Sequence, residues 1–161
     1  MQNKNEFVRV IQENEALIYK VSKVYTNSRE DAQDLYQEIV YQLWKSFGSF
    51  RHESKLSTWM YRIALNTAIS NLNKEKRKGT FLPISDWVLN RTETDDPLRE
   101  ERFELLYAHI RELSTVEKGI ILIYLEGKSY EEMAAITGFT TTNIGTRLGR
   151  IKQKLITQIK K

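Results

Sequence analysis

The sequence predicts an all-α protein with two helical domains joined by a linker. Apolar residues recur at spacings of three and four along most of the 161 residues, which is typical of amphipathic helices. No segment alternates apolar and polar residues convincingly, as a half-buried strand does. The helical pattern stops between residues 79 and 97, a segment that contains both prolines of the chain. We therefore expect a first domain at residues 1–78, a linker at 79–97 and a second domain at 98–161.

The composition limits the classes of function. The chain has no cysteine, which excludes a disulfide framework, a cysteine-ligated zinc site and a thiol nucleophile, and which fits a reducing compartment. Its polar start lacks the continuous apolar core of a secretory signal, and no window approaches the roughly 18 apolar residues of a membrane span. We therefore expect a cytoplasmic protein. Two basic segments, 51–78 and 127–161, flank an acidic one, which suits polyanion binding at two places or, equally, solvated helix faces.

Two helices are predicted before residue 50. The first has apolar residues at helical spacing: Phe7, Val10, Ile11, Leu17, Ile18, Val21, Val24 and Tyr25. Ser28, with Asp31 three residues later, forms a capping sequence for the second helix, which is expected to end at Gly48. The apolar face of that second helix consists of Leu35, Ile39, Leu43, Trp44 and Phe47.

A third helix is predicted after a polar connection. Ser57 or Thr58 is expected to open it. Its inward positions are Trp59, Met60, Ile63, Ala64, Thr67 and Ala68. In the linker that follows, the candidate anchoring residues are Leu82, Ile84, Trp87 and Val88.

The second domain opens with two helical stretches, 98–113 and 116–127, separated by Ser114 and Thr115. The run IILIYL within the second stretch can be a short buried strand in isolation. Its flanks continue the helical pattern, so we predict a helix there.

Residues 129–155 predict a helix-turn-helix. Ser129 is placed to cap a short helix whose first turn carries Glu131 and Glu132, and Gly138 allows the sharp turn that follows. Thr140, Thr141 or Thr142 is expected to cap the next helix. The small Ala134, the turn glycine and Ile144 stand at the spacing that packs the second helix on the first.

The second of these helices has two distinct faces. Its apolar stripe consists of Ile144, Leu148, Ile151 and Leu155. The opposite side can contact base edges and phosphates in a major groove, and it holds Asn143, Thr146, Arg147, Arg150, Lys152 and Lys154. An ordinary helical hairpin with a solvated basic face is the alternative. Gly145 and Gly149 also lie in this helix, where each costs about 1 kcal/mol relative to alanine.

The segment LEGKSYEEMAAITGFTTTNIGTRLGRIKQKL resembles region 4 of the sigma factors of bacterial RNA polymerase, in the sigma-70 family, and above all the extracytoplasmic-function (ECF) group. Response regulators carry a similar module. Residues 30–78 resemble sigma region 2 along their whole length, through DAQDLYQE, the aromatic Trp44 and Phe47, SFRHESKLSTW and YRIALN. One departure is Leu113-Ser114, where the family usually has a Leu-Pro pair; the serine can still cap the next helix.

The resemblance implies three binding surfaces. Core polymerase would be bound by Asp31, Asp34, Gln37 and Glu38; the alternatives are a solvated acidic face and, far less favoured, a metal-binding carboxylate group. The −10 element would be bound by Ser54, Lys55, Ser57, Thr58, Trp59, Arg62, Asn66, Lys74 and Arg77, with Trp59 open to a core role instead, and with Tyr61 and His52 as further candidates. The −35 element would be bound by Thr140, Thr141, Thr142, Asn143, Thr146, Arg147, Arg150 and Lys154.

The resemblance also implies which molecules the chain binds. The expected partners are bacterial core RNA polymerase, promoter DNA and an anti-sigma factor, which in this group is often membrane-anchored. No catalytic residue, metal, cofactor or small-molecule substrate is expected. The rival interpretation is a DNA-binding regulator of the response-regulator kind, but its receiver domain needs alternating strands that residues 1–78 do not predict. An enzyme is less favoured, because the chain has two histidines, no cysteine and no glycine-rich phosphate loop.

Overall fold

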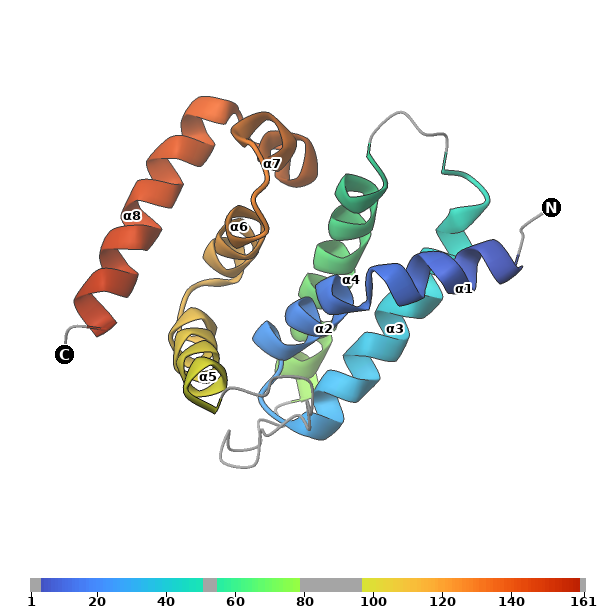
Figure 1. Cartoon of the computed structure of the whole chain (residues 1–161), viewed down its shortest axis with the longest axis horizontal. Helices are drawn as coiled ribbons and strands as arrows, with labels where there is room; N and C mark the ends of the chain where they lie inside the picture. The colour runs from blue at the N-terminus through green and yellow to red at the C-terminus, as the bar shows by residue number, and fades with distance from the viewer. Residues whose placement is uncertain (1–3, 51–54, 79–96, 160–161) are drawn as a thin grey trace.

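The described part of the chain consists of eight helices and contains no strand (Figure 1). This computed structural model describes residues 4–50, 55–78 and 97–159, of which 73–78 and 97–100 are described by their backbone only. The helices are α1 (Lys4–Glu13), α2 (Glu15–Val24), α3 (Arg29–Phe47), α4 (Leu56–Lys78), α5 (Pro97–Arg111), α6 (Thr115–Leu125), α7 (Tyr130–Thr137) and α8 (Thr141–Ile159). The predicted all-α fold is confirmed. The anchoring residues proposed for the linker, Leu82, Ile84, Trp87 and Val88, lie outside the described residues.

Helices α1 to α4 form the first half of the molecule, in which α2, α3 and α4 pack against one another. Their facing stripes bury Ile18, Leu35, Ile39, Leu43 and Met60 almost completely. Removing such side chains from water contributes about 1.5–3 kcal/mol each. The apolar spacing seen in the sequence therefore corresponds to the inner faces of three helices.

An aromatic cluster closes the end of this bundle. The Phe7 ring lies 5.0 Å from that of Trp44 and 5.2 Å from that of Phe47, edge-on to both. Trp59, at the start of α4, stacks on Phe50 with ring centroids 4.8 Å apart. Because each well-placed aromatic pair adds about 0.5–1.5 kcal/mol, the cluster ties α1, the end of α3 and the start of α4 together.

The first predicted helix is in fact two helices, separated at Asn14. This residue falls in the apolar phase, between Ile11 and Leu17, and its backbone leaves the helical region with φ −124°. Its N–H donates to Ile11 O at 3.1 Å, while its side-chain Nδ2 donates to Val10 O at 2.8 Å. The amide thus satisfies the carbonyl that an unbroken helix would have bonded through its backbone, which permits the break.

Two predicted capping residues are confirmed. Ser28 Oγ accepts a hydrogen bond from the Asp31 N–H at 3.1 Å. Ser114, which replaces the proline of the Leu-Pro pair usual in the family that the sequence resembles, forms a complete capping box with Glu117. The start of α6 therefore keeps its N-terminal donors satisfied without the proline.

The second half, α5 to α8, packs against the first half. Helix α6, which contains the IILIYL run and is helical as predicted, lies against both α2 and α4. A side chain on Gly119 would come within 3.2 Å of Tyr25 Oη, so the glycine permits this close approach. Tyr25 Oη donates to Thr115 O at 2.7 Å, and burial raises the pKa of this phenol. The buried residues of both halves form one continuous core.

Within the described residues, every helix is too short or too polar to cross a membrane.

Candidate nucleic-acid and polymerase interfaces

The helix-turn-helix consists of α7, a turn at Gly138 and α8. Ser129 caps α7 through a capping box with Glu132, and Gly138 ends it in the left-handed conformation, φ +86°. Of the three candidate threonines, Thr140 is the one whose Oγ1 accepts from the Asn143 N–H, at 3.1 Å. The predicted apolar stripe of α8 is confirmed, since Ile144, Leu148, Ile151 and Leu155 are all buried.

The polar side of α8 faces solvent along its length. Seven of the eight candidate −35 residues are exposed: Thr140, Thr141, Thr142, Asn143, Thr146, Arg150 and Lys154. The eighth, Arg147, is half-buried. This row of hydroxyl, amide and cationic groups on one helix has the chemistry that a major-groove surface requires.

Arg147 is held in position by two contacts within the helix-turn-helix. Its Nε donates to Asn143 Oδ1 at 2.6 Å, and its guanidinium carbon lies 4.4 Å from the centroid of the Phe139 ring. A side chain fixed in this way loses less rotamer entropy when it binds DNA. Further along α8, Lys154 pairs with Glu117 at 2.7 Å and Lys152 lies over the Tyr124 ring, so both cations contact α6.

The two glycines of α8 do not serve internal packing. A side chain added at Gly149 would meet nothing within 4 Å, and one at Gly145 would make only an ordinary contact with Tyr130, at 3.5 Å. We expect Gly149→Ala to stabilise the folded chain by about 0.5–1 kcal/mol, because alanine restricts the unfolded chain and favours the helix. Urea unfolding followed by circular dichroism measures the change.

The matched control for that prediction is Gly138→Ala. It introduces the same methyl group but places it at φ +86°, where a side chain costs about 1–2 kcal/mol. It should therefore lower the free energy of unfolding. A loss of stability in Gly149→Ala would contradict the packing described for α8.

Glu132 serves both the helix cap and a contact between the two halves. The Ser129 N–H bonds its Oε1 at 3.1 Å, and the Lys55 ammonium lies 3.2 Å from its Oε2. These two interactions lower the pKa of Glu132 from 4.5 to about 2, the backbone hydrogen bond contributing most.

A lowered carboxyl pKa stabilises the folded chain above the unfolded value, and this contribution is lost as the pH falls through the folded value. At pH 7, the free energy of unfolding of the parent chain should therefore exceed that of Glu132→Gln. The difference between the two free energies should narrow as the pH falls from about 4.5 toward 2. Urea unfolding between pH 7 and pH 3 measures it, with Glu131→Gln on the same turn as control. A gap that stays constant over this range would refute the assignment.

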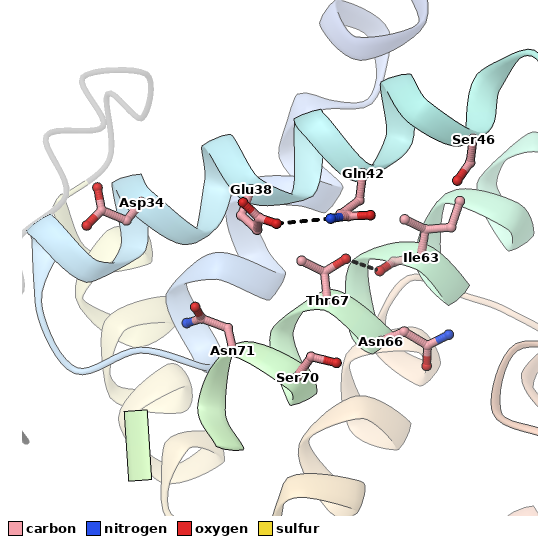
Figure 2. A pocket seen from close by; sticks show the side chains of 9 residues that line it. All are labelled: Asp34, Glu38, Gln42, Ser46, Ile63, Asn66, Thr67, Ser70 and Asn71. Carbon is pink, nitrogen blue, oxygen red and sulfur yellow. Dashed lines mark hydrogen bonds between the residues drawn. The ribbon is translucent and has the colours of Figure 1, made fainter. Parts of the chain in front are cut away.

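The candidate core-polymerase residues lie on α3. Asp34, Gln37 and Glu38 are exposed and Asp31 is half-buried in the first turn. Asp34 and Glu38 border a polar groove of about 540 Å³, and Figure 2 shows its lining side chains on α3 and α4. The groove is lined by Asp34, Glu38, Gln42, Ser46, Ile63, Asn66, Thr67, Ser70 and Asn71. Apart from Ile63, the lining consists of amides, hydroxyls and two carboxylates, and the groove joins the α3 face to the exposed side of α4.

The candidate −10 residues are not equally accessible. Lys55, Arg62 and Asn66 are exposed, and Asn66 lines the groove of Figure 2. Thr58 is buried, at 3% exposure. Trp59 is half-buried in the aromatic cluster, so its ring takes part in the packing of the core. Ser54 and His52 lie outside the described residues, as do the side chains of Lys74 and Arg77, whose backbone belongs to α4.

Three of the candidate −10 residues contact α7 or the residues just before it. Lys55 pairs with Glu132 at 3.2 Å, the Lys128 ammonium donates to Ser57 Oγ, and Arg62 Nη2 donates to the carbonyl oxygen of residue 135 at 2.6 Å. These contacts could not be predicted from the sequence, because no periodicity relates residues more than 70 positions apart.

The two halves also share an ion pair between the buried Lys23 of α2 and the partly exposed Glu104 of α5. Lys23 is only 2% exposed, and its ammonium lies 5.1 Å from the centroid of the Tyr107 ring. A second, partly exposed pair joins Lys20 to Glu126. The residues of both pairs were missed by sequence reasoning.

The first half is a helical bundle with an acidic helix face, and the second half contains a helix-turn-helix. This is the arrangement that the resemblance to sigma factors implies. Residues 10–78 match the family Sigma-70 region 2, and residues 103–155 match Sigma-70, region 4. The chain belongs to the sigma-70 family, in its ECF group.

Individual relatives support this family assignment. The chain is 30% identical to the ECF RNA polymerase sigma-E factor of Haemophilus influenzae, over 82% of this chain and 76% of the relative. It is 31% identical to the ECF RNA polymerase sigma factor SigG of Mycobacterium tuberculosis, over 82% of this chain but only 43% of that longer relative. Its fold is that of the sigma factor RpoE from Bartonella quintana, solved in complex with the anti-sigma factor NepR, with a TM-score of 0.77 at 24% identity over 96% of this chain and 97% of RpoE.

Proposed function

We propose that the chain is a dissociable initiation subunit that binds core RNA polymerase and directs promoter-specific transcription. Region 4 recognises the −35 element, and region 2 recognises and melts the −10 element. The chain itself catalyses nothing. The observation that carries the proposal is the presence, in one chain of this family, of an exposed polar face on α8 and a separate acidic face on α3.

We assign residues 1–78 to region 2, 79–97 to the linker and 98–161 to region 4. In region 4, the N-terminal turns of α8 carry the threonines and Asn143 toward base edges, and Arg147 and Arg150 bind bases or phosphates. The N–H groups at the start of α8 favour phosphate as well. The −35 surface is therefore Thr140, Thr141, Thr142, Asn143, Thr146, Arg147, Arg150 and Lys154.

In region 2, we assign core binding to Asp31, Asp34, Gln37 and Glu38, whose charge and exposure suit a basic partner surface. Separated strands are held by hydrogen bonds to unpaired bases and by cations on the backbone. The −10 surface is Ser54, Lys55, Ser57, Thr58, Trp59, Arg62, Asn66, Lys74 and Arg77. Of these, Lys55, Arg62 and Asn66 are directly accessible at the start and along the outer side of α4.

A partner protein that holds the chain inactive, an anti-sigma factor of the kind that is often membrane-anchored in this group, is part of the proposal. The RpoE structure similar to this fold contains the anti-sigma factor NepR, and by analogy we expect an anti-sigma factor for this chain. Because its partners are polymerase and chromosomal DNA, the chain works in the cytoplasm.

The proposal is tested by mixing the purified chain with core polymerase. We expect a complex that survives gel filtration and that produces a transcript of defined length from a linear promoter template. DNA binding without a complex with core would favour the rival regulator. That rival also requires a receiver domain with strands, whereas residues 4–50 and 55–78 are helical wherever they have regular structure.

A further inference from the structure

A second hollow, which we call the α2–α3 pocket, lies beside the acidic face of α3. It has a volume of about 480 Å³ and is lined by Tyr19, Ser22, Ala32, Gln33, Tyr36 and Gln37. Its surface is mostly apolar, whereas the groove between α3 and α4 is mostly polar. Of the residues that line the α2–α3 pocket, Gln37 is the one that also belongs to the core-polymerase surface assigned above.

The base of the pocket consists of two small side chains. Ser22 of α2 and Ala32 of α3 are each only 2% exposed. The Ser22 hydroxyl donates to Ile18 O of its own helix at 2.8 Å, so its hydrogen is already used. Burying a polar group against such a base is unfavourable, and burying a hydrocarbon or aromatic group is favourable. The base therefore favours an apolar occupant.

Two tyrosine rings stand higher in the pocket. Tyr19 and Tyr36 are both half-buried. The Tyr36 ring packs against the core, and the Lys23 ammonium lies 5.7 Å from the centroid of the Tyr19 ring. Rings that are already fixed by their neighbours lose little freedom when a partner binds. Preformed pockets of this kind are where single side chains contribute most to the affinity of an interface.

The mouth of the pocket adjoins the carboxylates of α3. The exposed Gln33 and Gln37 line the pocket, and the residues that follow them directly are Asp34 and Glu38 of the core-polymerase surface. Those two carboxylates line the groove on the α4 side (Figure 2). The pocket is thus continuous with the acidic face. The carboxylates repel DNA and attract a basic protein surface, so the charge beside the pocket selects a protein partner.

We propose, resting on the proposed function, that the α2–α3 pocket binds an apolar side chain of core polymerase, presented by a basic segment that lies along the acidic face of α3. The carboxylates attract and orient the basic segment. Burial of the apolar side chain between α2 and α3 slows its dissociation. The two contributions differ in their response to salt, because ionic strength screens exposed charges but does not weaken an apolar contact.

Gln33→Trp tests the proposal by filling the mouth of the pocket. Gln33 is exposed and lies outside the assigned surfaces, so the fold should tolerate the change. We expect binding to core polymerase to weaken at least about tenfold, the loss typical of a blocked central contact. Biolayer interferometry with immobilised core polymerase measures it. Gln12→Trp makes the same replacement at an exposed glutamine of α1 and should bind as the parent does. Equal weakening in both variants would overturn the proposal.

Tyr36 provides a second test, from the side of the pocket. Tyr36→Ala removes the ring and should weaken binding by a similar factor. Tyr36→Phe keeps the ring and should bind as the parent does. Urea unfolding checks that each variant is folded at the temperature of the binding measurement, and Gln33→Trp decides the matter if Tyr36→Ala is not. Equal loss in Tyr36→Ala and Tyr36→Phe would assign the effect to the hydroxyl and contradict an apolar site.

Salt distinguishes the pocket from the acidic face. Between about 0.1 M and 1 M NaCl the Debye length falls from about 10 Å to about 3 Å. The ratio of parent affinity to that of Gln33→Trp should stay constant over this range. For Asp34→Asn with Glu38→Gln, which neutralises the acidic face, the corresponding ratio should shrink toward one. A ratio for Gln33→Trp that shrinks in the same way would show that the tryptophan disturbs only the ionic contact, and would overturn the proposal.

The remaining outcomes separate this inference from the proposed function. A parent chain that forms no complex with core polymerase would remove the proposed function and this site with it. A parent chain that binds core polymerase, and whose affinity neither Gln33→Trp nor Tyr36→Ala lowers, would overturn the pocket alone. A chain that is dimeric in gel filtration and becomes monomeric through Gln33→Trp would make a second copy the occupant, which would also overturn the proposal.

Discussion

Replacing Arg147 and Arg150 together with alanine is expected to weaken binding of a −35 duplex on the order of 100-fold, since each arginine contact contributes about 1–3 kcal/mol. Arg150 is exposed on the outer face of α8, and Arg147 is oriented by Asn143 and Phe139. The guanidinium groups of both side chains can therefore contact bases or phosphates of a bound duplex. Anisotropy with a labelled duplex measures the loss.

The double variant should also show a smaller dependence of affinity on salt, because fewer cations displace counterions from the phosphates. Gln153→Ala, an exposed substitution further along α8, is the control for loss of a long side chain. An unchanged affinity in the double variant, with the fold intact by circular dichroism, would remove α8 as the DNA-binding helix.

The second large effect is expected at the acidic face of α3. Asp34→Lys combined with Glu38→Lys should abolish the complex with core polymerase, because like charges placed opposite one another cost several kcal/mol and slow the encounter. Both side chains are exposed at the rim of the groove in Figure 2, so the fold should tolerate the change. Gel filtration with core polymerase measures the complex.

A matched control carries the same change of charge elsewhere. Glu13→Lys with Glu101→Lys reverses two exposed carboxylates on α1 and α5 and should leave the complex with core intact. Both double variants should keep their −35 affinity. Equal loss of the complex in the two double variants would mean that net charge, and not the α3 face, governs assembly.

The sequence predicts the helices well where each depends on a local feature. Ser28 and Ser129 cap helices through hydrogen bonds within one turn, and Gly138 adopts the left-handed conformation that a sharp turn needs. The stripe that includes Ile144 and Leu148 follows directly from the helical period. Such features involve residues three or four positions apart, so a single sequence contains them completely.

The break at Asn14 also has a local cause, but the period alone does not predict it. The apolar spacing continues unchanged through Ile11 and Leu17, and only the hydrogen bond from the amide to Val10 O separates two helices from one. The capping box of Ser129 with Glu132 could have been predicted, because the two residues stand three positions apart. The additional pairing of Glu132 with Lys55 could not be predicted, since no periodic relation joins residues 77 positions apart.

The candidate binding residues also fall into two groups, those that a local sequence pattern predicts and those whose placement depends on tertiary packing. The −35 face follows from one amphipathic helix, and the sequence identifies it on that basis. The burial of Thr58, the packing of Trp59 and the contacts of Arg62 depend on how α4 meets other elements. Lys23 lies outside the apolar stripe of its helix, yet it is buried because α5 covers it. Only the assembled structure contains that information.

The most direct test of the two-site account is run-off transcription by core polymerase and this chain on a promoter that supports a defined start, compared with templates altered in the −35 or the −10 segment. We predict a specific transcript whose yield falls sharply when either segment is changed. The double variant Arg147→Ala with Arg150→Ala should lower the transcript yield on the parent template. On the template altered in the −35 segment, it should cause no further loss. Transcription that needs only one of the two segments, or that is no greater than with core polymerase alone, would contradict the account.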